Sequence, residues 1–230
     1  ERMSGVISFI CLNVMLIFFI ATFNYEQFFE QTKIENTLSE ETHERVGIVI
    51  LSIVMAILVI MFYFKGAFNF DSKARFLKIL AKIWIVLNLI LVFSTLLKNA
   101  EYVSNFGLTY KRLGVFAFLI LAVIGLVLTF VKISAKKKNI FLVNHMIWYF
   151  YGTVLVCSFV NWGSFLTRWN LDRKDFDKTY HVEHVDFNEN VLLEHYRNQP
   201  ENVSVIKSKI DYRREDQFLS KILYYEFVTQ

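Results

Sequence analysis

Acidic residues are missing from the middle of every long apolar run in this sequence. A proton pathway across a membrane normally needs buried carboxylates, so this absence argues against a proton-coupled pump in this part of the chain. Cysteine is scarce as well, and the only two, Cys11 and Cys157, both lie within apolar runs. Because cysteine in such surroundings usually packs as a small hydrophobic residue, we infer no disulfide bond.

The sequence motifs of common catalytic and metal sites are absent too. There is no Gly-rich phosphate loop, no Gly-x-Ser-x-Gly elbow, no His-Glu-x-x-His pattern and no zinc-type cysteine spacing. His181 and His184, in "HVEH", have a spacing that allows zinc binding with Glu183 or Glu194. Without a supporting motif, we interpret this pair as solvated surface residues. We therefore expect no catalytic residue, no metal and no cofactor.

Hydrophobic residues, in contrast, are abundant and gathered into long runs. They make up 55% of the chain, and the mean hydropathy is +0.39. Five runs are each long enough to cross a hydrocarbon core of ~30 Å at ~1.5 Å per residue, and they are residues 6–25, 46–64, 76–97, 113–133 and 140–162. The alternation that a membrane β-barrel needs is absent. The sequence therefore predicts an all-α, polytopic membrane protein with about five transmembrane helices.

The distribution of lysine and arginine predicts the orientation of these helices. Basic residues gather after the second and fourth runs: Lys65, Lys73, Arg75 and Lys78, then Lys132, Lys136, Lys137 and Lys138. The loop after the first run is mainly acidic. We therefore expect the N-terminus inside and the C-terminus outside. Because topology segregates the positive charge, the net charge of +4 does not indicate a nucleic-acid partner.

Residues 163–230 are much more polar than the rest and form the predicted outward tail, following a transmembrane domain of residues 1–162. Two segments have helical spacing of apolar residues. One is "NENVLLEHYRN", and the other carries Ile206, Ile210, Phe218, Ile222 and Tyr225. A tail of this length makes only a thin core. We expect it to be small, mostly helical and dependent on the membrane domain or on a partner.

Several polar residues lie within the apolar runs. Lys82 is near one end of the third run, where its ammonium can snorkel to the lipid headgroups. Asn13, Asn88, Asn144 and His145 are neutral and suit hydrogen bonds between helices. A role of these residues in transport or in a proton relay is the alternative that remains open.

The turn "NFGLTYKRLG" precedes the fourth run and has the features of a helix end followed by a helix start. Gly107 suits a positive φ that turns the chain back, and Thr109 suits the N-cap position. We expect Arg112 to be shielded at least in part by the tail, with Glu101 or a tail carboxylate nearby. A dedicated ligand or partner contact is the alternative. Further along, Ala122, Gly125 and Thr129 are small residues that share one helix face, which permits close helix packing.

The segment "WIVLNLILVFSTLLKNAEYVSNFGLTYKRLGVFAFLILAVIGLVLTFVKI" resembles a family of bacterial polytopic membrane proteins known only as a domain of unknown function. The shared pattern is a Tyr followed by Gly-Leu-Thr-x-x-Arg, before a Gly-containing span. "HERVGIVILSIVMAILVIMFYFKG" resembles the preceding helix of that family, and "VNWGSFLTRWNLDR" resembles its junction between the last span and the tail, with Trp169 in place of the usual Tyr. Arg168 and Asn170 are the candidate contact residues of this junction.

The resemblance covers residues 46–173 and implies the fold, while the family has no established activity. It implies a bacterial inner-membrane location with a periplasmic tail. Members are about twice as long, with further spans towards the N-terminus, so we expect this chain to be the C-terminal portion of a longer member.

Two classes of function remain open, with a membrane-embedded enzyme as a weaker third. In the first, the chain is a non-catalytic subunit or scaffold of a membrane complex, contacting membrane lipids and other membrane or periplasmic proteins. In the second, it is part of a transporter or of a lipid-handling protein. We favour the first.

Overall fold

The computed structural model describes residues 2–29, 35–65, 67–215 and 222–227, and these form helices without any strand. Five helices are long and apolar enough to cross a membrane, with candidate spans Met3–Thr22, Val46–Tyr63, Arg75–Phe106, Tyr110–Ser134 and Asn139–Phe159. The predicted all-α class and the five membrane helices are thus confirmed. The chain divides into two compact units, one of Glu1–Glu101 with Gly114–Leu155 and the other of Tyr102–Leu113 with Val156–Gln230.

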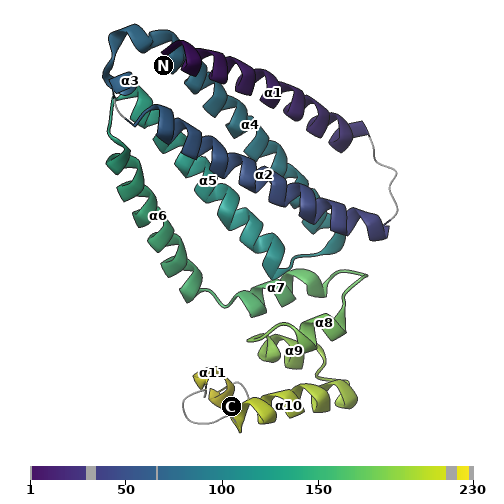
Figure 1. The fold of residues 1–230 in the computed structure, drawn as a ribbon. Helices are drawn as coiled ribbons and strands as arrows, with labels where there is room; N and C mark the ends of the chain where they lie inside the picture. Colours follow the sequence, from purple (N-terminus) through teal and green to yellow (C-terminus); the bar gives the residue numbers. More distant parts are fainter. Residues whose placement is uncertain (1, 30–34, 66, 216–221, 228–230) are drawn as a thin grey trace. The chain divides into compact units, whose positions relative to one another are not determined.

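The long helices of the first unit lie side by side in Figure 1. They are α1 (Arg2–Phe29), α2 (Glu35–Tyr63), α4 (Arg75–Phe106), α5 (Tyr110–Ser134) and α6 (Asn139–Phe159), with the short α3 (Ala67–Phe70) and the 3-10 helix η1 (Ser72–Ala74) between α2 and α4. Their candidate spans expose many large apolar side chains as well as burying others, as expected for helices that contact both protein and lipid. Helix α6 is the least buried of the five.

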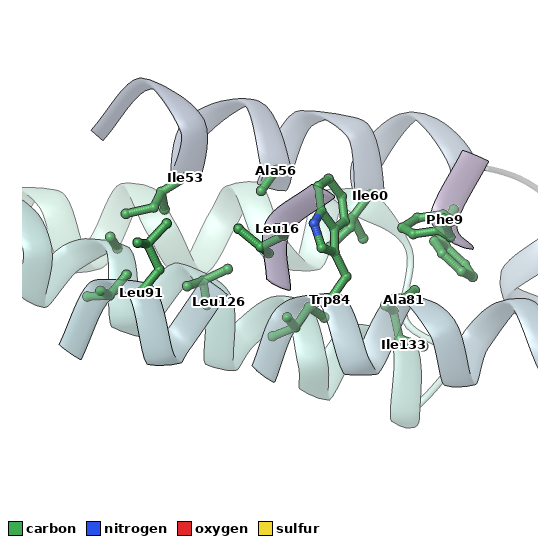
Figure 2. Packing of buried hydrophobic residues seen from close by; sticks show 14 of the residues in the cluster. Phe9, Leu16, Ile53, Ala56, Ile60, Ala81, Trp84, Leu91, Leu126 and Ile133 are labelled. Atoms are coloured by element: carbon green, nitrogen blue, oxygen red, sulfur yellow. The ribbon is translucent and has the colours of Figure 1, made fainter. Parts of the chain in front are cut away.

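The core of this unit fills the space between α1, α2, α4 and α5 (Figure 2). Phe9 of α1 is fully buried, with its ring centroid 5.3 Å from that of Tyr63 and 5.4 Å from that of Trp84. Gly125 of α5 packs closely against its neighbours, because a Cβ there would lie 3.3 Å from Ile57 Cδ1. The predicted small-residue face of α5 is therefore a packing face.

Helices α2 and α4 extend furthest beyond the predicted runs. Helix α2 begins at Glu35, so part of the acidic segment expected as loop is helical. Helix α4 continues past residue 97 to Phe106, and Lys98 and Glu101 form an ion pair of 3.8 Å along this extension. An apolar run marks the part of a helix that suits lipid, and the helix itself continues until a residue such as Gly107 ends it.

Among its described residues, the second unit contains the short helices α7 (Trp162–Leu171), α8 (Lys178–Glu183), α9 (Glu189–His195), α10 (Pro200–Arg214) and α11 (Leu223–Phe227). Their apolar core consists of Val182, Leu192, Tyr196, Ile206, Ile210 and Tyr225. Beside it, the fully buried Glu189 pairs with Lys209 at 3.0 Å. The helix predicted in "NENVLLEHYRN" corresponds to α9, and the last predicted segment corresponds to α10 and α11, while Phe218 lies outside the described residues.

Candidate functional site

The turn between α4 and α5 has the geometry that its sequence predicts. Gly107 has a φ of +78°, and its N–H donates to Val103 O at 2.9 Å, which closes the C-terminal end of α4. Thr109 is the N-cap of α5, because its Oγ1 accepts a hydrogen bond of 3.4 Å from the Arg112 N–H. The chain thus reverses within three residues.

Asn170 of α7 holds this turn through both ends of its amide. Its Oδ1 accepts a hydrogen bond of 2.8 Å from the Leu108 N–H, and its Nδ2 donates one of 2.8 Å to the Leu108 carbonyl. A Cβ on Gly107 would lie 2.7 Å from Asn170 Oδ1, so the close approach also requires glycine. Two sequence segments that are 62 positions apart, each quoted above for its resemblance, therefore meet at one contact.

Two arginines satisfy the carbonyl groups at the end of α4. Arg173 donates to Ser104 O at 2.6 Å and to Asn105 O at 2.5 Å, and it pairs with Asp175 at 3.1 Å. Arg112 Nη1 donates to Phe106 O at 2.7 Å and also to Gly107 O. The last carbonyls of a helix have no partner within it and carry partial negative charge. Guanidinium groups from α5 and from the segment after α7 supply both the hydrogen bonds and the positive charge.

Arg112 is shielded from solvent, with an exposed fraction of 8%, while its predicted shielding by the tail and a carboxylate neighbour stays a prediction. Its guanidinium carbon lies 4.1 Å from the centroid of the Tyr102 ring, a cation–π contact. Tyr180 of α8 is within electrostatic range of the same guanidinium. Glu101, one of the predicted carboxylate neighbours, pairs with Lys98.

A buried polar network continues from Asn170 to α8 and α9. Asn170 Nδ2 lies 3.2 Å from His181 Nε2, Thr167 Oγ1 lies 3.0 Å from His181 Nδ1, and Asn188 Nδ2 donates to Thr167 Oγ1 at 2.8 Å. Since Asn170 Nδ2 can only donate, His181 Nε2 must accept, and the proton of the neutral ring sits on Nδ1. Burial lowers the pKa of His181 from 6.5 to about 4. The His181 ring is therefore neutral, and its two nitrogens link Asn170 and Thr167 within the buried network.

The interpretation of His181 as a solvated surface residue is wrong, whereas His184 is exposed. The ring of His181 stacks on Phe176, with the ring centroids 4.7 Å apart. Val182 and Val185, also buried, mark the inward face of this segment. That apolar pair is the sequence signal that favours a buried histidine at position 181. The interpretation of His181 and His184 as one solvated pair did not take this signal into account.

A cavity of 230 Å³ lies beside the turn and the network. Arg173, Asp175, Asp177, Tyr180 and His181 line it together with the turn residues Phe106 to Thr109. This volume is below the ~300–1,000 Å³ typical of small-molecule sites. Its charged groups are paired or hydrogen-bonded, as for Arg173 with Asp175 and for Asp177, which accepts from the Tyr180 N–H. In the described ranges, no group of three or more His, Cys, Asp or Glu is placed to hold a metal ion.

The other predicted site residues lie apart from this cluster. Arg168 is exposed in the last turn of α7. Asn13 forms the expected interhelical hydrogen bond, from Nδ2 to Leu80 O at 3.2 Å. Lys82 Nζ lies 5.1 Å from the centroid of the Phe130 ring.

Asn144 and His145 of α6 and Asn88 of α4 do not form the expected hydrogen bonds between helices within the described part of the chain. Asn144 and His145 are exposed, and His145 Nδ1 lies 2.8 Å from Phe141 O in its own helix. Asn88 is almost fully buried, and its Nδ2 donates to Trp84 O one turn earlier at 2.8 Å. Lys132, expected in a basic turn, lies inside α5 with no exposed surface.

Sequence reasoning missed Arg173, Thr167 and Asn188 as parts of the site. Arg173 ends the quoted segment "RWNLDR", yet nothing local distinguishes it from a solvated arginine. Thr167 and Asn188 are buried only because α7, α8 and α9 meet around His181. Such tertiary burial has no periodic signal in the sequence.

Neither the comparison with curated proteins nor the comparison with solved structures gives a match. A sequence model described as "Domain of unknown function (DUF4153)" matches residues 1–193, which include all five candidate membrane helices, the turn at Gly107 and the network around His181. The chain therefore belongs to the DUF4153 family.

Proposed function

We propose that this chain is a non-catalytic integral-membrane subunit or scaffold of the bacterial inner membrane. Its N-terminus lies in the cytoplasm, and the unit built from α7 to α11 lies in the periplasm and binds a membrane or periplasmic protein. The polar groups of the site support a structural role, because Arg112, Arg173 and Asn170 all bind backbone atoms. Groups engaged in this way are not free to act on a substrate.

The observation that carries the proposal is a set of exposed apolar side chains on α10 and α11, which we name the α10–α11 patch. It consists of Val205, Tyr212, Leu223 and Phe227, with exposed fractions of 51%, 73%, 75% and 65%. The surrounding segment is rich in charged residues, and its described residues contain no candidate membrane span. Large apolar side chains exposed outside the lipid favour a protein-binding surface.

The orientation is supported by the position of the basic residues. Asn69, in the segment after α2, donates from Nδ2 to Lys137 O at 2.7 Å in the turn after α5. This bond joins the two basic connections at one end of the first unit. The Lys78 ammonium is repelled there by those of Lys136 and Lys82. Such a concentration of positive charge favours the cytoplasmic side.

The test is purification from native membranes in mild detergent, with the mass of the particle and its protein composition as readouts. We expect the wild-type chain to elute with a partner protein in fixed stoichiometry. The double variant Tyr212→Ser with Leu223→Ser should elute without that partner, because the α10–α11 patch is lost.

The matched control is Lys207→Ser, an exposed position of α10 outside the patch, which should retain the partner. A wild-type chain that elutes alone, or a double variant that retains the same partner at the same stoichiometry, contradicts the proposal.

A further inference from the structure

A groove of 260 Å³ lies in the first unit between α1, α2 and α4. Leu12, Leu16 and Phe19 of α1, Ser52 of α2, and Trp84 and Asn88 of α4 line it. Leu16 and Trp84 also belong to the core cluster that Figure 2 labels. For comparison, a cavity of about 150 Å³ in a protein core accommodates benzene. The groove therefore has room for a segment of an alkyl chain.

The groove opens at the apolar surface of the helices. Met15 and Ile48 stand at its rim, with exposed fractions of 69% and 52%. Both belong to candidate membrane spans, so the opening lies on the part of the helices that is long and apolar enough to contact lipid. A molecule that reaches the groove must first dissolve in the bilayer.

Asn88 gives the groove a polar group of fixed direction. Its exposed fraction is 1%, and its Nδ2 donates to Trp84 O at 2.8 Å. Since a carbonyl oxygen can only accept, the amide nitrogen must face Trp84 and the amide oxygen must point away from it. That oxygen has no hydrogen-bond partner among the described residues. A buried acceptor without a hydrogen-bond partner is energetically unfavourable, so a donor that reaches it would be favoured.

We propose that this groove binds a membrane-soluble amphiphile that carries a hydrogen-bond donor, such as the hydroxyl of a long-chain alcohol or of a monoacylglycerol. The alkyl chain lies against Leu12, Leu16 and Phe19, and the hydroxyl donates to Asn88 Oδ1. The acyl chain of an ordinary phospholipid fills the same space but offers no donor. The donor thus decides which lipid the groove prefers, and this preference is independent of the partner-binding role proposed above.

The experiment measures contact quenching of Trp84 in the full chain, reconstituted in phosphatidylcholine nanodiscs. Trp148→Phe, Trp162→Phe and Trp169→Phe leave Trp84 as the only tryptophan. The probes are 8-bromo-1-octanol and its isomer 1-bromo-7-methoxyheptane, which have the same atoms, while only the alcohol donates a hydrogen bond. Concentrations are expressed per lipid, so that unequal partitioning into the bilayer does not enter the comparison.

We expect saturable quenching, with half-quenching by the alcohol at a concentration about fivefold lower than by the ether, as one hydrogen bond predicts. Asn88→Leu should bring this ratio to about one, whereas Asn144→Leu, the same change on the exposed surface of α6, should leave it unaltered. Ser52→Phe, which fills the groove without changing Asn88, should remove saturable quenching by both probes.

Three results overturn the proposal. They are equal half-quenching concentrations in the wild-type background, quenching that rises linearly without saturation, and a ratio that survives Asn88→Leu. If Asn88→Leu does not fold, Ser52→Phe still decides the matter, because saturable quenching that persists in that variant excludes the groove as the binding site.

Discussion

At the scale of single residues, a guanidinium group suits the end of a helix better than an ammonium group does. The last carbonyl groups of a helix point along its axis without partners in the helix, and a planar group with several fixed donors can bind more than one of them. Arg173 binds Ser104 O and Asn105 O in this way, and Arg112 binds Phe106 O and Gly107 O. The positive charge also opposes the negative end of the helix dipole.

Arg112→Lys is therefore expected to destabilise the protein, although the charge is kept. A lysine at an exposed interfacial position anchors about as well as arginine, but Arg112 is buried against Tyr102 and binds two carbonyls. Losing one of these hydrogen bonds costs ~1–3 kcal/mol. Thermal unfolding in detergent measures the effect, with Arg168→Lys as the control at an exposed arginine. Equal unfolding temperatures for Arg112→Lys and the wild type contradict this prediction.

Gly107→Ala is expected to destabilise the turn between α4 and α5. The φ of +78° is unfavourable for a residue with a Cβ, and that Cβ would lie 2.7 Å from Asn170 Oδ1. The change should cost about 2 kcal/mol or more and weaken both hydrogen bonds to Leu108.

Gly114→Ala provides the matched control, because its Cβ meets no atom within 4 Å and it lies within a helix. Alanine there should raise stability by up to ~1 kcal/mol. Thermal unfolding of the two variants in the same detergent compares them directly. A Gly107→Ala protein as stable as the Gly114→Ala protein means that the turn is not strained.

At the scale of elements, the buried ring of His181 joins α7, α8 and α9 in one network, and this predicts a dependence on pH. Burial holds the pKa of His181 at about 4, below its ordinary value of 6.5. Between these values the unfolded chain binds a proton that the folded chain does not, so stability falls as the pH decreases from about 6.5 to about 4. Protonation at Nε2 also removes the acceptor for Asn170 Nδ2. The loss should be on the order of 3 kcal/mol.

His181→Gln removes the titrating group and should flatten this part of the stability profile, as measured by unfolding temperature against pH. His184→Gln, at an exposed position two residues after the buried Val182, should leave the profile of the wild type unchanged. A His181→Gln protein with the same pH profile as the wild type shows that other groups produce the dependence.

The elements differ in how well the sequence predicts them. Runs of apolar residues give the five membrane helices directly, because only a helix satisfies its backbone in lipid. The start of α2 and the end of α4 cannot be predicted in this way, because polar residues such as Lys98 and Glu101 continue a helix beyond its apolar run. The turn at Gly107 and Thr109 is predictable because it depends on local backbone chemistry. The contacts of Asn170, Arg173 and His181 are not, because they exist only once distant segments have met.

At the scale of the whole molecule, residues 163–230 depend on a segment of the same unit, Tyr102–Leu113, that is far from them in the sequence. Leu108 binds Asn170, and the carbonyls of Ser104 and Asn105 bind Arg173. Residues 163–230 alone lack these partners, although they retain the core around Ile206 and Ile210. The expectation that the tail depends on the rest of the chain thus acquires a specific physical reason and stays a prediction.

The orientation in the membrane is the last prediction, and it follows from charge. The turn of residues 135–138 carries Lys136, Lys137 and Lys138, and the bond from Asn69 to Lys137 O places the other basic connection beside it. Transferring these lysines across the membrane is unfavourable. In a Cys11→Ser, Cys157→Ser background, an impermeant thiol reagent applied to intact cells should label Glu194→Cys on α9 and leave Lys137→Cys unlabelled. Both positions are exposed, so permeabilised cells should label both, which controls for accessibility. Since the candidate span Asn139–Phe159 separates the two labelled positions, labelling of Lys137→Cys alone in intact cells would reverse the proposed orientation and move the α10–α11 patch into the cytoplasm.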